Sequence, residues 1–82
     1  NSVAGNTVLG ESALDASVSG GNNTAIGKGA LTTNTSGTDN VAVGFNSMQL
    51  NTTGTNNVGV GRRALADNTS GANNTAIGNT KG

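Results

Sequence analysis

Residues 21–37 read Gly-Asn-Asn-Thr-Ala-Ile-Gly-Lys-Gly-Ala-Leu-Thr-Thr-Asn-Thr-Ser-Gly, and residues 38–54 follow the same pattern as Thr-Asp-Asn-Val-Ala-Val-Gly-Phe-Asn-Ser-Met-Gln-Leu-Asn-Thr-Thr-Gly. Equivalent residues lie seventeen apart along the whole chain. Three columns keep this interval without a slip: Gly10, Gly27, Gly44, Gly61 and Gly78; Gly20, Gly37, Gly54 and Gly71; and Asn6, Asn23, Asn40, Asn57 and Asn74. A chain built from one short unit is expected to stack its units against one another.

The unit is numbered here from position one to position seventeen, with position one at Ala4, Gly21, Thr38, Thr55 and Ala72. This numbering gives complete repeats at 4–20, 21–37, 38–54 and 55–71, and a partial repeat at 72–82. Both ends of the 82 residues fall inside a unit and neither carries a polar capping unit. We therefore expect residues 1–82 to form a single repeat array that belongs to a longer fibre.

The composition rules out an ordinary globular core. Only 32% of the residues are hydrophobic, and Phe45 is the one aromatic residue. A zero net charge and the absence of Pro argue against disorder. Glycine at fixed corners and Asn and Thr between them oppose helix formation. The sequence thus predicts an all-β fold, a β-solenoid or β-roll with seventeen-residue rungs, with a short strand at positions three to six and a second around positions ten to twelve.

Two columns stay large and apolar in every unit, and we expect them to form the structural core. They are position six (Leu9, Ile26, Val43, Val60, Ile77) and position eleven (Leu14, Leu31, Met48, Leu65). Position five is small in every unit, which would permit a neighbouring chain to approach closely. Burying two aliphatic side chains, at about 1.5–3 kcal/mol each, does not offset the ordering of seventeen residues. This shortfall favours a homo-oligomer, a trimer or an end-to-end filament, over a single coil.

The invariant asparagines and glycines have structural roles in this interpretation. Glycine supplies corner conformations, and Asn side chains satisfy turn backbone groups or stack as ladders between rungs. Asn-x-Ser/Thr sequons begin at Asn22 and Asn73, and again at position fourteen of three units. Chance sequons are expected in a chain so rich in Asn and Thr, and glycosylation is the alternative for Asn34, Asn51 and Asn68.

The chain lacks the side chains that most chemistry requires. It contains no His and no Cys, and its four acidic residues occupy four different columns. We therefore expect no catalysis, no metal and no cofactor. Four basic residues balanced by four acidic ones predict no nucleic-acid partner and no membrane contact in this segment.

The strings Gly21-Asn22-Asn23-Thr24-Ala25-Ile26-Gly27 and Asn34-Thr35-Ser36-Gly37 resemble the Asn/Thr-rich repeats of phage and virus tail-fibre shafts. The motif Ala-Ile-Gly, which recurs at residues 76–78, resembles the head repeats of trimeric autotransporter adhesins of the YadA type. The resemblance implies a left-handed solenoid of three chains, located outside the cell, on the cell surface or on a virion. It also implies a host-surface or matrix receptor as partner.

Two functions follow from these observations. The first is a structural and adhesive fibre, a rigid shaft or head that presents a surface for attachment. The alternative is a monomeric solenoid that binds a surface, as a glycan-coated filament or an ice-binding protein does. A repetitive binder needs a flat outer column that is uniform in every rung, and the uniform columns are explained here as core and turns. The pattern therefore favours the fibre.

Overall fold

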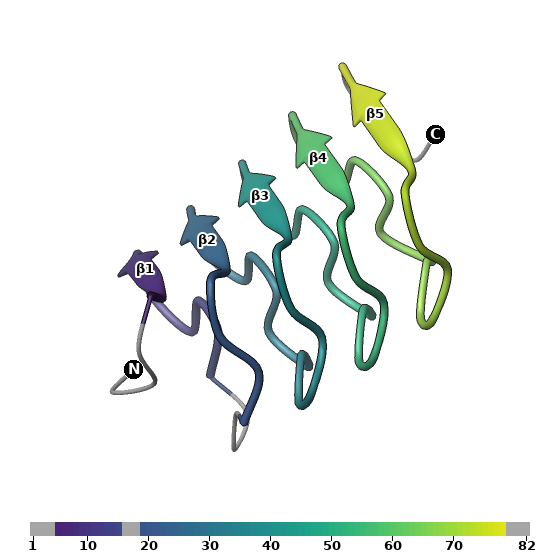
Figure 1. Ribbon diagram of the computed structural model, residues 1–82. Coiled ribbons are helices and arrows are strands. Elements are labelled where there is room, and N and C mark those ends of the chain that lie inside the picture. The colour runs from purple at the N-terminus through teal and green to yellow at the C-terminus, as the bar shows by residue number, and fades with distance from the viewer. Residues whose placement is uncertain (1–4, 16–18, 79–82) are drawn as a thin grey trace.

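The computed structural model describes residues 5–15 and 19–78, which coil into a β-solenoid of about four turns (Figure 1). Parts of the repeats at 4–20 and 72–82 lie outside these ranges. Each rung contributes one strand to a parallel sheet in chain order. The strands are β1 (Thr7–Leu9), β2 (Thr24–Ile26), β3 (Val41–Val43), β4 (Val58–Val60) and β5 (Thr75–Ile77). The described chain has no helix, so the predicted all-β solenoid is confirmed.

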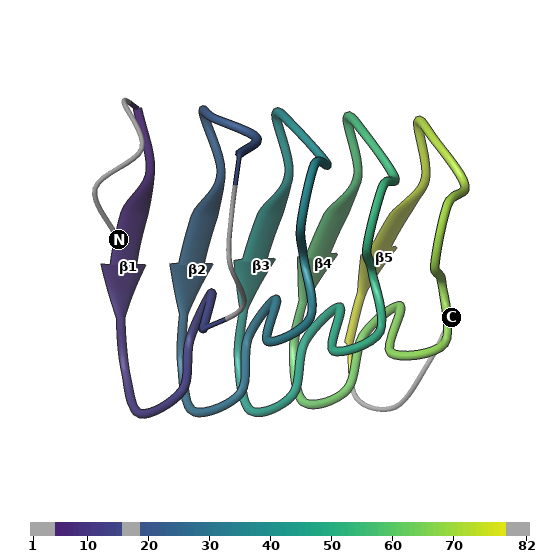
Figure 2. The same ribbon diagram turned by 90° about the horizontal axis from the view of Figure 1, so that it is seen from below.

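Strand pairing keeps the period of the sequence. Thr24 of β2 pairs with Val41 of β3, and every other pair in the sheet is likewise seventeen residues apart. Figure 2 shows the strands side by side along one side of the coil, with turns and irregular segments closing each rung. A three-residue strand is too short to be stable alone, so each depends on the rungs beside it.

Hydrogen bonds between rungs continue beyond the strands. The amide of Leu31 donates to the carbonyl of Ser47 at 3.0 Å, and the amide of Thr52 donates to that of Thr69 at 2.9 Å. At the glycine corner after the strand, the amide of Gly44 donates to the carbonyl of Ile26 at 2.7 Å. The sides, corners and strands of each rung therefore bond to the next rung. Such pairing satisfies backbone groups that would otherwise be buried without partners.

The second strand predicted at positions ten to twelve is wrong, because this segment is a pair of turns. Ala30 donates to Gly27 at 3.2 Å, and Asn34 donates to Leu31 at 3.2 Å. The first residue of the second turn has a left-handed backbone, with φ of 51° at Leu31 and 52° at Met48 in the next rung. A leucine in this region costs on the order of 1–2 kcal/mol, so its burial and hydrogen bonds must hold it there.

The strands face the opposite way from the sequence prediction. Successive side chains of a strand alternate between its two faces. Position five points inward, so Ala25 and Ala42 are fully buried. Position six points outward, and the prediction that it forms the core is wrong. In that column Ile26, Val43 and Val60 are half-buried, and Leu9 and Ile77 are 67% and 75% exposed. Position eleven does lie in the interior: Leu14, Leu31, Met48 and Leu65.

The narrowness of the coil explains this inversion. The turn segment packs directly across from the strand, which leaves little room at position five. A Cβ atom added to Gly59 would lie 2.9 Å from Met48 Cγ and 3.1 Å from the carbonyl oxygen of Ala64. A branched aliphatic side chain pointing inward would collide with this segment. The interior therefore takes small residues from the strand and one large aliphatic residue from the turn.

Candidate functional surface

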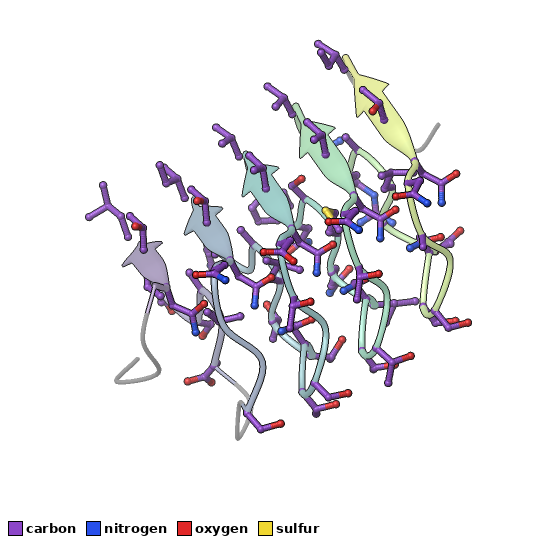
Figure 3. All side chains as sticks on the ribbon, in the orientation of Figure 1. Carbon is purple, nitrogen blue, oxygen red and sulfur yellow. The ribbon has the colours of Figure 1, made fainter. Side chains whose placement is uncertain are left out.

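The outer side of the sheet carries two columns of side chains, at positions four and six, and we call this surface the strand face. Figure 3 shows side chains standing outward from the strands in successive rungs. The strand face consists of Thr7, Leu9, Thr24, Ile26, Val41, Val43, Val58, Val60, Thr75 and Ile77. All but Leu9 are β-branched, which suits a pleated surface.

The strand face is regular in both directions. Parallel pairing places Ile26 beside Val43 and Val43 beside Val60, so each column advances by one strand spacing, about 4.8 Å, per rung. Position six is aliphatic in every rung, whereas position four is Thr in three rungs and Val in the two rungs at 38–54 and 55–71. A contiguous exposed apolar surface on a soluble protein commonly marks an interaction site. No charged side chain belongs to the strand face, so this surface is suited to a dry contact.

The asparagines at position three hold the inner side of the sheet together. Asn23 Oδ1 accepts a hydrogen bond from the backbone amide of Asn40 at 3.0 Å, and Asn23 Nδ2 donates to the carbonyl of Gly37 at 2.9 Å. Asn40 repeats both contacts with the next rung, at 3.0 Å and 2.8 Å. These asparagines, expected to form a ladder or satisfy turns, therefore join each strand to the next rung through its backbone.

A ladder in which side-chain amides hydrogen-bond to one another lies instead at position fourteen. Asn51 Nδ2 donates to Asn34 Oδ1 at 3.0 Å, and Asn68 Nδ2 donates to Asn51 Oδ1 at 3.2 Å. Asn34 and Asn51 are fully buried, and Asn68 is half-buried. A glycan on either buried amide would break this ladder, so we expect Asn34 and Asn51 to be unmodified in the folded chain. Asn22 and Asn73, which begin the other sequons, are exposed.

The corner glycines at position seven are required by backbone conformation and by close packing. Gly27 and Gly44 have φ of 124° and 127°, in a region that other residues rarely adopt. A Cβ atom on Gly27 would lie 2.8 Å from the carbonyl carbon of Gly44 in the next rung. The other members of this column, Gly10, Gly61 and Gly78, also have positive φ.

The variable columns follow the corner. Position eight is exposed in each described rung: Glu11, Lys28, Phe45 and Arg62. Position nine is mixed, because Ser12 is exposed, Asn46 and Arg63 are half-buried, and Gly29 is buried. Position eight therefore faces solvent in the described rungs, and position nine does so only in part.

The described ranges contain no cluster of three or more His, Cys, Asp or Glu residues that could hold a metal ion. Across residues 5–15 and 19–78 no helix is long and apolar enough to cross a membrane. The strand face is the candidate functional surface because its columns are regular and carry no charged side chain. Comparison with protein-family models, curated proteins and solved structures gave no match to this chain.

Proposed function

We propose that this chain is a segment of a structural and adhesive fibre in which copies of the chain cover one another's strand faces. The observation that supports this proposal best is the position of the branched side chains. Ile26, Val43 and Val60 lie on the outside in consecutive rungs. Because this column lies on the outside, its side chains do not fill the interior of the coil. They are suited to contact with another molecule.

The apolar content of a rung supports an oligomer. The interior of a complete described rung receives one large aliphatic side chain, such as Leu31, together with small residues and amides. The strand face carries two further branched side chains per rung, such as Val41 and Val43. Covering a side chain of this size contributes about 1.5–3 kcal/mol when burial is complete. Contact with another molecule would therefore add apolar burial in each rung to the burial that the interior provides.

A second copy of the chain is the partner that matches this surface best. Any partner must present apolar side chains at the rung spacing over several rungs. Another copy, aligned along the same axis, presents that spacing in each rung through its own strand face. Three copies around a common axis would give every strand face two neighbours and leave three outer surfaces for attachment.

The resemblance to tail-fibre shafts and adhesin heads supports three parts of this proposal. These are the trimer, the left-handed winding and the location outside the cell or on a virion. The residues that carry it, Ala25-Ile26-Gly27, form the end of β2 and its corner. In this arrangement the chain performs no catalysis. It acts as a stiff spacer or head that holds an attachment surface toward a host-surface or matrix receptor.

Sedimentation equilibrium or native mass spectrometry tests the oligomer. We expect a species of three times the 7.9 kDa chain mass. The variant Val43→Asp, which places a charge at the centre of the strand face, should dissociate this species, whereas Lys28→Asp at exposed position eight should leave it assembled. A wild-type monomer at high micromolar concentration, or an assembly indifferent to Val43→Asp, would refute a covered strand face.

One observation favours the second candidate, a solenoid that binds a surface such as ice. The sequence pattern favours the fibre when its uniform columns are explained as core and turns. The structure instead places position six, which is aliphatic in every rung, on a regular outer face. Thr7, Thr24 and Thr75 add hydroxyl groups to that face. The remaining rungs have Val at position four, and position six has no hydroxyl in any rung. The fibre therefore remains the better-supported function.

The substitution Thr24→Val separates the two functions. Val occupies the same position in the two following rungs, so the rung can accept it. An oligomer should be preserved or strengthened, because the strand face becomes more apolar. Ice binding through ordered hydroxyls should weaken, which measurements of thermal hysteresis and ice recrystallisation would detect. Ice activity in a wild-type monomer, lost in Thr24→Val, would establish the second function in place of the first.

A further inference from the structure

The corner that follows each strand carries a straight row of exposed side chains at position eight. Backbone hydrogen bonds keep this row in register: Asn46 donates to the carbonyl of Lys28 at 2.9 Å, and Arg63 donates to that of Phe45 at 2.9 Å. Consecutive side chains therefore start about one strand spacing apart, 4.8 Å, along the solenoid axis. Lys28, Phe45 and Arg62 follow one another in three successive rungs, and we call these three residues the corner row.

Positive charge gathers at this corner. Within residues 5–15 and 19–78 the basic side chains are those of Lys28, Arg62 and Arg63, all at positions eight and nine. Asp39 lies at position two, at the other end of the strand. Glu11 is the acidic member of the same column, one rung before Lys28. Residues 21–71 contain three basic side chains and two acidic ones, Asp39 and Asp67, and all three basic side chains lie at positions eight and nine.

The single aromatic ring of the chain stands inside this row. Phe45 is 40% exposed, and the guanidinium carbon of Arg62 lies 5.6 Å from the centre of its ring. This separation is that of a cation–π contact. The contact restrains a long side chain that would otherwise move freely, so less entropy is lost when Arg62 engages a ligand. The corner row thus presents a cation, an apolar ring and a restrained cation in a line.

We propose that the corner row binds a linear acidic polysaccharide that lies along the solenoid axis. Lys28 and Arg62 contact acid groups of the polymer, and Phe45 packs against the C–H face of a sugar ring between them. An acidic polysaccharide carries acid groups beside the apolar C–H faces of its sugar rings, and the corner row likewise has an apolar ring between two cations. Nucleic acid is less suitable, because its affinity rests on many phosphate contacts and on several stacking rings in a groove. This proposal does not depend on what covers the strand face.

Binding can be measured by isothermal titration calorimetry of the protein in its native assembly, at low ionic strength, with polygalacturonate fragments and with heparin fragments. The double variant Lys28→Gln with Arg62→Gln should weaken binding by about tenfold or more, since it removes two charged contacts. Phe45→Leu should weaken binding severalfold without changing its salt dependence. Glu11→Gln should strengthen it, because the opposing charge is removed.

A matched control changes the net charge by the same amount elsewhere. Asn22→Asp with Asn56→Asp adds two negative charges at position two, where Asp39 already occurs naturally. This control should leave binding nearly unchanged. Position eight holds a different residue in each rung and position two already holds Asp39, so these substitutions suit the fold. Circular dichroism would verify that each variant is folded.

Three results would overturn the proposal. The first is no binding of either polysaccharide at low salt. The second is an equal loss of binding in the position-two control, which would show that binding depends only on the overall charge of the protein. The third is equally tight binding of an oligo-dT strand through the same residues, which would identify a general polyanion contact. Loss in the corner-row variants alone, with weaker binding of DNA, would support it.

Discussion

The side-chain amide of Asn51 donates a hydrogen bond to the side-chain oxygen of Asn34 one rung earlier, at 3.0 Å, and neither side chain is exposed. Asn51 Oδ1 accepts in turn from Asn68 Nδ2 at 3.2 Å. This ladder runs through the interior from rung to rung, along the solenoid axis and across the direction of the strands. Each amide has its partners only when rungs are aligned at an offset of seventeen residues. A slip of one residue would leave buried donors and acceptors unsatisfied, so the ladder defines the register.

Removing the middle amide should therefore cost more than the loss of one contact. We expect Asn51→Ala to lower the free energy of unfolding by about 1–3 kcal/mol, because Asn34 Oδ1 stays buried without this donor. Asn56→Asp, at an exposed position where Asp39 occurs in the preceding rung, serves as the control and should change stability little. Urea unfolding followed by circular dichroism measures both. Equal midpoints for the two variants would mean that the ladder does not stabilise the fold.

Burial of the ladder also predicts which sequons remain accessible in the folded protein. An N-glycosyltransferase that acts on folded protein should modify Asn22, which is exposed, and leave Asn34 unmodified. Glycopeptide mass spectrometry distinguishes the two sites. A synthetic peptide covering residues 31–39 provides the control, because its Asn34 has no ladder and should be modified. Rapid modification of Asn34 in the folded chain would contradict the buried ladder.

Gly59 and Met48 compensate for each other's size. A Cβ atom on Gly59 would lie 2.9 Å from Met48 Cγ and 3.0 Å from Ser47 Oγ. The neighbouring rung solves the same packing problem differently, with Ala30, Leu31 and Ala42 in the equivalent places. The fourth rung has the smaller residue on the strand because the third rung has the larger residues on the turn.

This compensation predicts coupling between the substitutions. Gly59→Ala alone should destabilise the protein by about 1 kcal/mol through overpacking. The same change combined with Ser47→Ala and Met48→Leu reproduces the neighbouring rung and should recover this loss. Chemical denaturation of the single, double and triple variants gives the coupling free energy. Additive effects, with no recovery in the triple variant, would show that the two positions do not share one space.

The period, the corner glycines and the parallel stacking could be predicted from the sequence because each depends on residues that recur at a fixed interval. The direction of the strand could not be predicted from hydrophobicity. The aliphatic column at position six predicts that this side of the strand points inward, but the coil is too narrow for Ile26 or Val43. The useful signal is the small column containing Ala25 and Ala42, which lies on the same inward side of the strand as the invariant asparagines. Leu31 gave no warning of its left-handed backbone, since leucine seldom adopts it.

Two aspartate substitutions in one rung test the corrected orientation. The side chain of Leu31 is fully buried in the interior of the coil, whereas that of Ile26 is half-buried and lies on the outer face. Leu31→Asp should unfold the array, at a cost above about 4 kcal/mol, because it buries a carboxylate without a partner. Ile26→Asp should preserve the secondary structure of the rung and mainly weaken association between chains. The thermal midpoint of this variant should therefore depend less on protein concentration than the midpoint of the wild type does.

Circular dichroism and sedimentation of the same samples separate the two effects. Assignment of position six to the core predicts that Ile26→Asp unfolds the chain as completely as Leu31→Asp does. The structure predicts instead a folded chain with altered association, because the new carboxylate can remain in water beside Thr24 on the strand face. Loss of the β-sheet signal in Ile26→Asp at concentrations where the wild type is monomeric and folded would show that the outer column stabilises the single coil itself.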